Sequence, residues 1–285
     1  ITQQLADDLY AHNWMAAKIV DAPIDDALRK WRTIQIPDAD KKKAIENKYK
    51  KLDIKTKISM GHKWARVHGG SALVIIIEGD NHAEELDFEK IRPGTLKDIL
   101  VLDRWDIGFN GSVNNDIMSG RFGEPDSYTI HRTRTSFHHS RVIKINGKIT
   151  TRREYEQNGY WGTSVFSRVF DPIVASGSTT QAISSLVYEA NVDVYKIEGF
   201  NDLVAEAGDG GEDLALKRLK YAHSMKSVIN GIALDKNDEY DVKTANFANL
   251  AEIDDRFTQK VSGAGNLPMT RLVGISPAGL NATGE

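Results

Sequence analysis

Two short amphipathic helices, separated by about sixty residues, constrain this chain more than any other feature. The pattern predicts them at 178–190 and 249–262, each with a narrow stripe of apolar side chains at helical spacing. Helices of this length are marginal alone in water, so their stripes must pack on each other, on the rest of the chain or on neighbouring copies. The stripe residues are Ile183, Leu186, Val187 and Ala190 in the first helix and Leu250, Ile253, Phe257 and Val261 in the second.

Capping signals set the predicted ends of both helices. Ser178 and Gln181 have the spacing of a capping box, in which two side chains bond free backbone amides at a helix start. Asn249 and Glu252 repeat that spacing before the second helix. Gly263 is expected to end the second helix, because glycine readily adopts the left-handed conformation found just beyond helix ends.

The segment between the two helices is predicted to form a small α+β module. Residues 192–200 alternate as a strand does, an amphipathic helix is expected near 216–225, and 231–243 have the pattern of a hairpin around a polar turn. The tail from 261 to 285 is rich in Gly, Ser, Asn and Pro and is long for a connector. We expect it to be either disordered or functional.

The first third of the chain is predicted to be mainly helical. Residues 7–31 carry a helical apolar pattern that Pro23 should divide in two, because an internal proline removes an amide and clashes with the preceding turn. One long helix is expected from about 39 to 67. Eight lysines lie within 41–57. Apolar residues interleave with them at helical spacing, which favours a solvated helix face over a DNA-binding patch.

The middle of the chain is predicted to form a sheet. Residues 71–79 are an unbroken apolar strand, a type that is usually covered on both faces. The Gly, Asn and Ser-rich segment 111–123 is predicted to be a loop, and 160–173 to be a loop that enters a helix. Further strands are expected within 96–109, 127–133 and 139–148. The fold class is therefore α+β.

Composition limits the classes of function. The 285 residues carry a net charge of −3, whereas a protein that binds DNA tightly by neutralising phosphates normally has a basic excess. Tight static DNA binding is therefore disfavoured, and weak or transient contact remains open. The absence of cysteine excludes disulfides and thiolate metal sites. The longest apolar run, 72–77, is too short to span a bilayer, so no membrane partner is expected.

One catalytic motif is half present. His131 and Thr133 match an H-x-[ST] element, two of which present paired imidazoles to a phosphate in two-histidine phosphoesterases. His223 has the wrong offset for a second element, and the pair at 138–139 lies too close in sequence to be independent. The histidines are therefore expected to be exposed strand residues. A nucleotide phosphoesterase that uses His131 and Thr133 is kept as an alternative.

Metal and phosphate sites receive little support. Asp103, Asp106 and Asp116 are carboxylates without a ligand spacing, and we expect them at strand ends and in loops. The glycines at 208, 210 and 211 lack the remaining residues of a phosphate-binding loop. The sequence predicts no metal, no cofactor and no enzymatic activity.

Six sequence blocks suggest a family. Together, in this order, they resemble a portal protein of tailed bacteriophages, of the type common in prophages, and the resemblance covers essentially the whole chain. The blocks are LYAHNWMAAKIVDAPIDDALRKW, WARVHGGSALVIII, SRVIKINGK, YWGTSVFSRVF, VYEANVDVYKIEGF and PMTRLVGISPAGLNATGE.

The resemblance implies a domain order for the α+β chain. It implies an α/β wing domain at 1–177, a first stem helix at 178–190, a clip at 191–248, a second stem helix at 249–262, and a truncated tunnel-loop region at 263–285. The crown region that the family has after the tunnel loop is not present in this sequence. Apolar stem residues would pack between subunits of a ring: Ile183, Leu186, Val187, Leu250, Ile253 and Phe257.

The implied function is architectural. Portal subunits form a ring, twelve-fold in such families, at one capsid vertex of the virion, after assembly in the host cytoplasm. Double-stranded DNA passes through the ring during packaging and ejection. The implied partners are further copies of the chain, terminase docked at the clip, the capsid, and head-completion or adaptor proteins.

Four residues are expected near the DNA path: Lys260, Asn266, Arg271 and Asn281. Plain solvent exposure is the alternative for each of them. A further alternative for the whole chain is another oligomeric phage head component that has no DNA channel.

Overall fold

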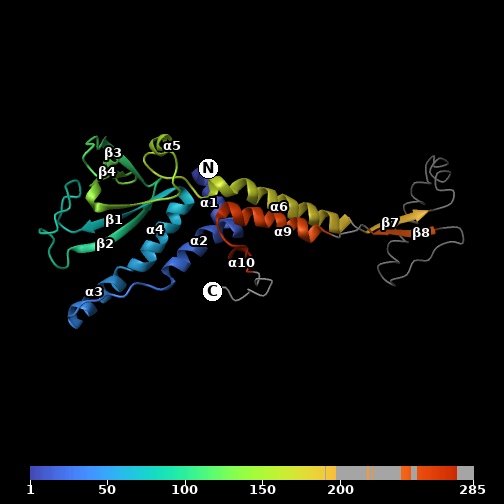
Figure 1. The fold of residues 1–285 in the computed structure, drawn as a ribbon, viewed down its shortest axis with the longest axis horizontal. Helices are drawn as coiled ribbons and strands as arrows, with labels where there is room; N and C mark the ends of the chain where they lie inside the picture. Colours follow the sequence, from blue (N-terminus) through green and yellow to red (C-terminus); the bar gives the residue numbers. More distant parts are fainter. Residues whose placement is uncertain (190, 197–216, 218–219, 221–238, 245–248, 275–285) are drawn as a thin grey trace. The chain divides into compact units, whose positions relative to one another are not determined.

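The computed structural model describes residues 1–189, 191–196, 217, 220, 239–244 and 249–274. The chain divides into two compact units. The first contains Ile1–Gly177 with Asp255–Glu285, and the second contains Ser178–Asp254. Both helices and strands are present, as the α+β prediction requires (Figure 1).

The first unit begins with two helices, α1 (Gln3–His12) and α2 (Trp14–Arg29). The prediction that Pro23 separates them is wrong, because Pro23 lies inside α2. The break falls at Asn13, whose extended backbone and side-chain bond to the Ala16 amide (3.0 Å) make it the N-cap of α2. Arg66 donates to the Ile19 carbonyl (2.7 Å), which is the carbonyl that an amide at position 23 would otherwise satisfy.

The predicted long helix is also two helices, α3 (Ala39–Lys51) and α4 (Ile54–His68). They are separated at Asp53, which adopts a left-handed conformation with φ of 48°. Leu52 and Ile54 are both buried. Residues two positions apart do not share a face of a helix, so the break allows both side chains to be buried. Gly69 ends α4 with φ of 92°.

Two antiparallel sheets follow α4. The first has the strand order β2–β1–β6 and is covered by α4, which packs against both β1 and β2 (Figure 1). The second has the order β3–β4–β5. The strands are β1 (Gly70–Ile77), β2 (Leu96–Asp103), β3 (Ile107–Val113), β4 (Pro125–Ile130), β5 (Thr135–His138) and β6 (Val142–Asn146). The strands expected within 71–79, 96–109, 127–133 and 139–148 are confirmed. However, β3 continues to Val113, into the segment 111–123 that was predicted to be a loop, and β5 was not expected.

The two sheets share one core. Side chains from both sheets and Trp161 form this core, in which Ile107 is fully buried. A short helical turn, η1 (His139–Arg141), joins β5 to β6, and α5 (Arg152–Gln157) lies on the surface. The other members of this core are Ala72, Val74, Leu102, Tyr128, Ile130, Phe137 and Val142.

A second core joins the chain's beginning to its later helices. These are α6 (Phe166–Glu189), α9 (Leu250–Gly265) and α10 (Met269–Leu272). In the first unit, α2 packs against the start of α6, the end of α9 and α10. The fully or nearly fully buried members include Ile19, Val20, Val165, Phe166, Val169, Ile173, Val261, Leu267 and Leu272.

The predicted start of the first stem helix and the predicted end of the second stem helix need correction. Ser178 does not cap a helix, because α6 begins twelve residues earlier, at Phe166. Phe166, Val169, Ile173 and Ser176 are buried at helical spacing, so packing in the second core outweighs the local capping signal. Gly263 lies inside α9, which continues to Gly265.

The second unit contains the end of α6, the start of α9 and a two-stranded sheet. Strand β7 (Asn191–Lys196) pairs antiparallel with β8 (Glu239–Thr244), with Tyr195 opposite Tyr240. The strand expected at 192–200 is therefore confirmed up to Lys196, and residues 197–200 lie outside the described residues. Within the described residues the partner of β8 is β7; the other arm of the expected hairpin, and most of the helix expected near 216–225, lie outside them.

Candidate functional site

Arg271, one of the four residues expected near DNA, is held by an ion pair. It lies on α10, and its guanidinium donates to both carboxylate oxygens of Asp26 on α2, at 2.5 and 3.1 Å. This two-point geometry fixes the guanidinium plane. Both side chains remain about half exposed, at 50% and 43%. The charge of Arg271 is therefore partly compensated at the surface.

The other expected DNA-path residues have different settings. Lys260 is exposed on α9, with its ammonium 4.6 Å from the centre of the Phe257 ring. Asn266 is exposed just after α9 and has a φ of 52°, the left-handed conformation that ends many helices. Asn281 lies outside the described residues. Of the three predicted DNA-path residues that the structure describes, only Arg271 therefore forms an ion pair.

An open hollow of about 430 Å³ lies beside this ion pair. Trp14 is 54% exposed at its edge, and Asp21 and Asp25 both bind Lys63, at 3.3 and 2.8 Å. The hollow thus combines apolar surface with charged side chains, of which Asp21, Asp25 and Arg271 already have partners. Its lining residues are Trp14, Ala17, Lys18, Asp21, Ala22, Asp25 and Arg271.

The six predicted stem-packing residues share one property: none of them is buried. Leu186 is 50% exposed, Val187 is 52% exposed and Ile253 is 42% exposed. Ile183, Leu250 and Phe257 are half-buried. Within the second unit, Thr180 of α6 donates to Asp254 of α9 at 2.7 Å.

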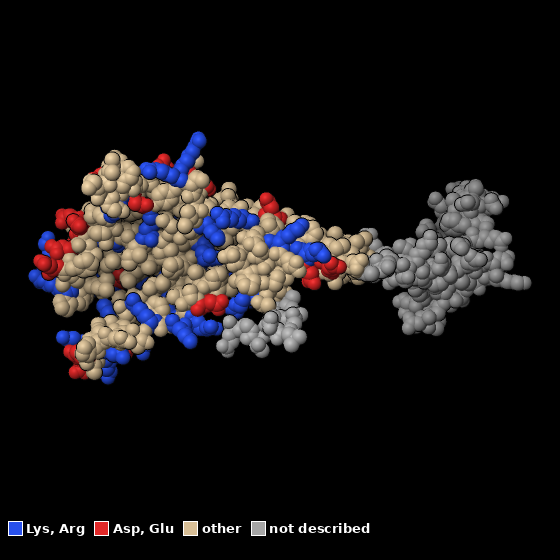
Figure 2. Space-filling model, in the orientation of Figure 1, with Lys and Arg blue, Asp and Glu red and all other residues tan. Residues whose placement is uncertain are grey.

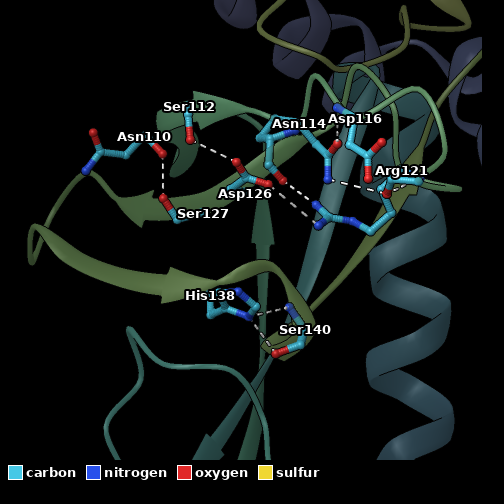
Figure 3. A network of polar contacts seen from close by, with 11 residues as sticks. Asn110, Ser112, Asn114, Asp116, Arg121, Asp126, Ser127, His138 and Ser140 are labelled. Carbon is cyan, nitrogen blue, oxygen red and sulfur yellow. Dashed lines mark hydrogen bonds and ion pairs between the residues drawn. The ribbon is translucent and has the colours of Figure 1, made fainter.

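A polar network holds the loop between β3 and β4 (Figure 3). Asp116 accepts the amide of Met118 (2.9 Å), and its own amide binds the Asn114 side chain (2.9 Å). Arg121 donates to the Pro125 carbonyl (2.5 Å) and lies 3.8 Å from Asp126. Asp116 is therefore occupied in shaping the loop, and the contacts do not join it to the other two suggested metal carboxylates.

Asp103 and Asp106 also have structural partners. Asp103 ends β2 and accepts the amides of Trp105 (2.7 Å) and Asp106 (3.0 Å). Burial raises the pKa of the Asp106 carboxyl, and the negative charge of Asp103 adds to the shift. His68, which is buried, has its Nε2 3.6 Å from both Asp103 and Asp7. Across the described part of the chain, no group of three His, Cys, Asp or Glu side chains is placed to hold a metal.

The suggested phosphoesterase residues lie on a turn. His131 and Thr133 are both exposed in the connection between β4 and β5, not on a strand as expected. The sequence also contains His138 and Ser140 at the same H-x-[ST] spacing, with His138 Nδ1 2.9 Å from the Ser140 hydroxyl (Figure 3). That hydroxyl accepts the Leu86 amide at 2.8 Å, so this element organises a loop.

One partly buried ionic cluster was not foreseen. Lys144 of β6 binds Glu124 and the Tyr155 hydroxyl, and also donates to the Tyr160 carbonyl at 3.2 Å. Burial lowers the pKa of Lys144, while Glu124 opposes that shift. Lys144 and Glu124 are twenty residues apart in the sequence, and no local sequence pattern predicts that they pair. The cluster joins the two sheets to α5 and has the character of a structural contact.

No helix among the described residues is long and apolar enough to cross a membrane.

Curated relatives cover the chain along nearly its whole length. A protein of Caulobacter sp. (strain RHG1) named anti-CBASS protein Acb1 is 31% identical over 97% of this chain and 46% of that protein. A protein of Sphingomonas paeninsulae with the same name is 31% identical over 100% of this chain and 47% of that protein. An uncharacterised Haemophilus influenzae protein is 28% identical over 97% of this chain and 62% of its own length. The chain thus spans about half the length of the first two relatives.

Solved structures share the fold. A chain from the virion of a native gene transfer agent particle covers 97% of this chain and 70% of its own length, with a TM-score of 0.51 and 14% identity. A chain from the neck of an empty gene transfer agent particle has a TM-score of 0.50, with 14% identity, 98% coverage of this chain and 71% of its own length. The sequence profile of a family described as phage portal protein matches residues 4–285. The chain therefore belongs to the phage portal protein family.

Proposed function

We propose that this chain forms a closed ring at one capsid vertex and that double-stranded DNA passes through the ring during packaging and ejection. Family membership makes the chain a portal-type capsid component. The ring, its DNA channel and the docking of terminase at residues 191–248 are the steps that the proposal adds. Twelve copies are expected from the family resemblance.

The observation that carries this proposal is the apolar surface that the two stem helices leave uncovered. Leu186 and Val187 are adjacent on α6 and each is about half exposed, and Tyr188 next to them is 89% exposed. Ile253 on α9 is 42% exposed. Burying a large apolar side chain contributes about 1.5–3 kcal/mol, so packing between neighbouring copies would stabilise an assembly substantially. A ring forms when one patch of each copy contacts a different patch of the next copy, and when the rotation between neighbouring copies adds up to a full turn.

The charge of the chain agrees with a channel for moving DNA. The net charge is −3, and Arg271 on α10 is already paired with Asp26. Each tight contact to a phosphate would add a barrier to sliding, because every neutralised phosphate contributes to affinity. A channel that carries few uncompensated cations lets a polyanion pass. Lys260, Asn266 and Arg271 are kept as proposed channel residues on this ground.

The test is assembly of the full-length protein that contains these residues. We expect the wild type to form a closed ring with an axial hole wide enough for duplex DNA, seen by native mass spectrometry and particle imaging. Leu186→Asp with Val187→Asp should shift the population to smaller species, because two carboxylates would have to be buried. Ser185→Asp is the matched control, since it adds a charge to the same helix at an exposed position without removing apolar surface.

The outcomes separate the possibilities. A wild-type protein that stays monomeric or dimeric at all salt concentrations would contradict the ring. A closed assembly without an axial hole would favour a head component that has no channel. Equal assembly of the double variant and the Ser185→Asp control would remove the stem stripe from the interface.

A further inference from the structure

The lysine segment, residues 41–57, forms an exposed cationic face. It contains eight lysines and two acidic residues. The helix α3, which carries most of it, has no buried residue. Lys43, Lys50, Lys51 and Lys55 are all exposed, and Figure 2 shows basic side chains over this part of the molecule. A helix of this length with so little burial and so many like charges needs other support.

That support comes from three anchors at the edges of the segment. Asp38 caps α3 by accepting the amides of Asp40 (3.0 Å) and Lys41 (3.1 Å). Lys48 donates to the Leu96 carbonyl at 2.9 Å, and Lys57 forms an ion pair with Asp98. The anchors fix the segment against the start of β2. Lys41 also forms an ion pair with Asp38 (3.6 Å). Lys43, Lys50, Lys51 and Lys55 are exposed and form no ion pair among the described residues.

A surface of opposite charge lies on the same unit. The acidic segment, residues 78–89, contains six acidic residues and neither lysine nor arginine. Glu84, Glu85 and Glu89 are exposed. Phe88, placed among them, is 78% exposed. An exposed aromatic ring surrounded by charges is a common composition for the centre and rim of a protein interface.

Buried Arg141 gives the acidic segment a fixed shape. Its guanidinium donates to the Glu84 carbonyl (2.8 Å) and the Glu85 carbonyl (3.3 Å), and lies 2.6 Å from the Asp80 carboxylate. Arg141 itself is only 1% exposed. Arg141 thus holds the main chain of the segment from the protein interior, while the side chains of Glu84 and Glu85 stay exposed. A surface that is rigid before binding loses less entropy on association.

We propose that the lysine segment of one subunit docks on the acidic segment of a second copy of this chain. Across the described residues, no ion pair joins the two segments within one chain. Glu78, Asp80 and Asp87 already pair within the chain. Glu84, Glu85 and Glu89 form no ion pair among the described residues, so contact between copies would pair them with the exposed lysines. When the lysine segment of each copy contacts the acidic segment of the next copy, the interface is heterologous, which is the type from which rings are built. The inference deepens the proposed ring and rests on it.

The same complementarity argues against duplex DNA as the occupant. A DNA-binding face gains from a surrounding positive field, but this unit carries an acidic segment as well and the whole chain is net negative. Opposite patches on two copies steer association and fix its register. Duplex DNA therefore becomes an alternative outcome of the experiment.

The experiment is a charge swap in the full-length protein. Lys43→Glu with Lys50→Glu, and separately Glu84→Lys with Glu85→Lys, should each raise the subunit concentration needed for assembly by about tenfold or more. The four substitutions combined should restore assembly, because the pairs are re-formed with reversed sign. Arg132→Glu with Arg153→Glu is the matched control at exposed positions outside both segments, and should have no effect. Sedimentation velocity at about 50 mM and about 500 mM salt measures the change, and wild-type assembly should weaken as salt screens the pairs.

Each outcome has one meaning. Restoration by the combined variant supports the docking even where a double variant assembles poorly. Failure of the combined variant to restore assembly overturns it, and so does normal assembly of both double variants while the wild type forms its ring. Binding of a duplex oligonucleotide that depends on Lys43 and Lys50, with assembly unchanged, also overturns it. A wild type that forms no assembly at all contradicts the ring itself.

Discussion

At the scale of single residues, Gly147 lies where backbone segments approach one another closely. A Cβ atom there would lie 2.4 Å from the Ala65 carbonyl oxygen and 2.7 Å from the Thr163 carbonyl oxygen. The end of α4, the residue after β6 and the segment before α6 meet at this point. Backbone atoms cannot move aside as a flexible side chain can. Only glycine fits the site, and packing rather than a turn conformation is the reason.

We expect Gly147→Ala to lower the free energy of unfolding by about 3 kcal/mol, the upper end of the usual range for overpacking a tight core. Gly177→Ala is the matched control, because nothing lies within 4 Å of a Cβ at that position inside α6. That change should stabilise the protein by about 0.5–1 kcal/mol through helix propensity. Urea denaturation of both variants tests the pair, and equal effects would contradict the close approach at Gly147.

At the scale of elements, the connection between β1 and β2 depends on one buried side chain. Arg141, in η1, holds the carbonyls of Glu84 and Glu85 from 57 and 56 residues away. Leu86 adds a buried apolar contact, and its amide binds the Ser140 hydroxyl. A long surface connection gains order from such contacts because its own residues form neither helix nor strand.

We expect Arg141→Met to destabilise the protein by about 2–4 kcal/mol, because the two carbonyls and the Asp80 carboxylate lose their partner. Hydrogen exchange should rise within residues 80–87. Arg153→Met is the control at an exposed position and should change stability by less than about 0.5 kcal/mol. Unchanged exchange in that segment would show that Arg141 does not hold it.

At the scale of the whole molecule, the end of the described chain returns to its beginning. Leu267 and Leu272 are buried with Ile19 and Val20, and Arg271 pairs with Asp26 across 245 positions of sequence. Residues 263–274, expected at the start of the tunnel-loop region, therefore contribute to the core of the first unit. Their proposed place near the DNA path stays a prediction.

The Arg271–Asp26 pair separates a structural role from a role in DNA handling. Arg271→Glu should lower stability by about 1 kcal/mol, since a favourable surface pair becomes a repulsive one. Adding Asp26→Arg should restore the stability, because the pair is re-formed in reverse. If a positive charge at position 271 acts on DNA, particles built with the swapped protein should still show altered DNA retention. Restoration of both stability and retention by the swap would assign Arg271 a structural role alone.

Local periodicity predicted much of the fold. Patterns of apolar residues predicted strand β1 and most of the later strands of the middle segment. They also predicted the start of a helix within 160–173 and a strand beginning at 192. Two of the misplaced boundaries share one cause. Pro23 and Ser178 are strong local signals, but both lie inside helices whose buried faces belong to the second core. Packing free energy there exceeds the local cost, which is about 3 kcal/mol for a proline inside a helix and about 1 kcal/mol for an unused cap.

The sequence by itself therefore determined the α+β class, most element positions, the apolar stem stripe and the resemblance to portal proteins. The tertiary structure alone decided which distant side chains meet: Asp26 with Arg271, Arg141 with the acidic segment, and Gly147 with the end of α4. The reason is physical. Periodicity reports which face of one element is apolar, whereas the choice of a partner far along the chain depends on how all the elements close around a shared core.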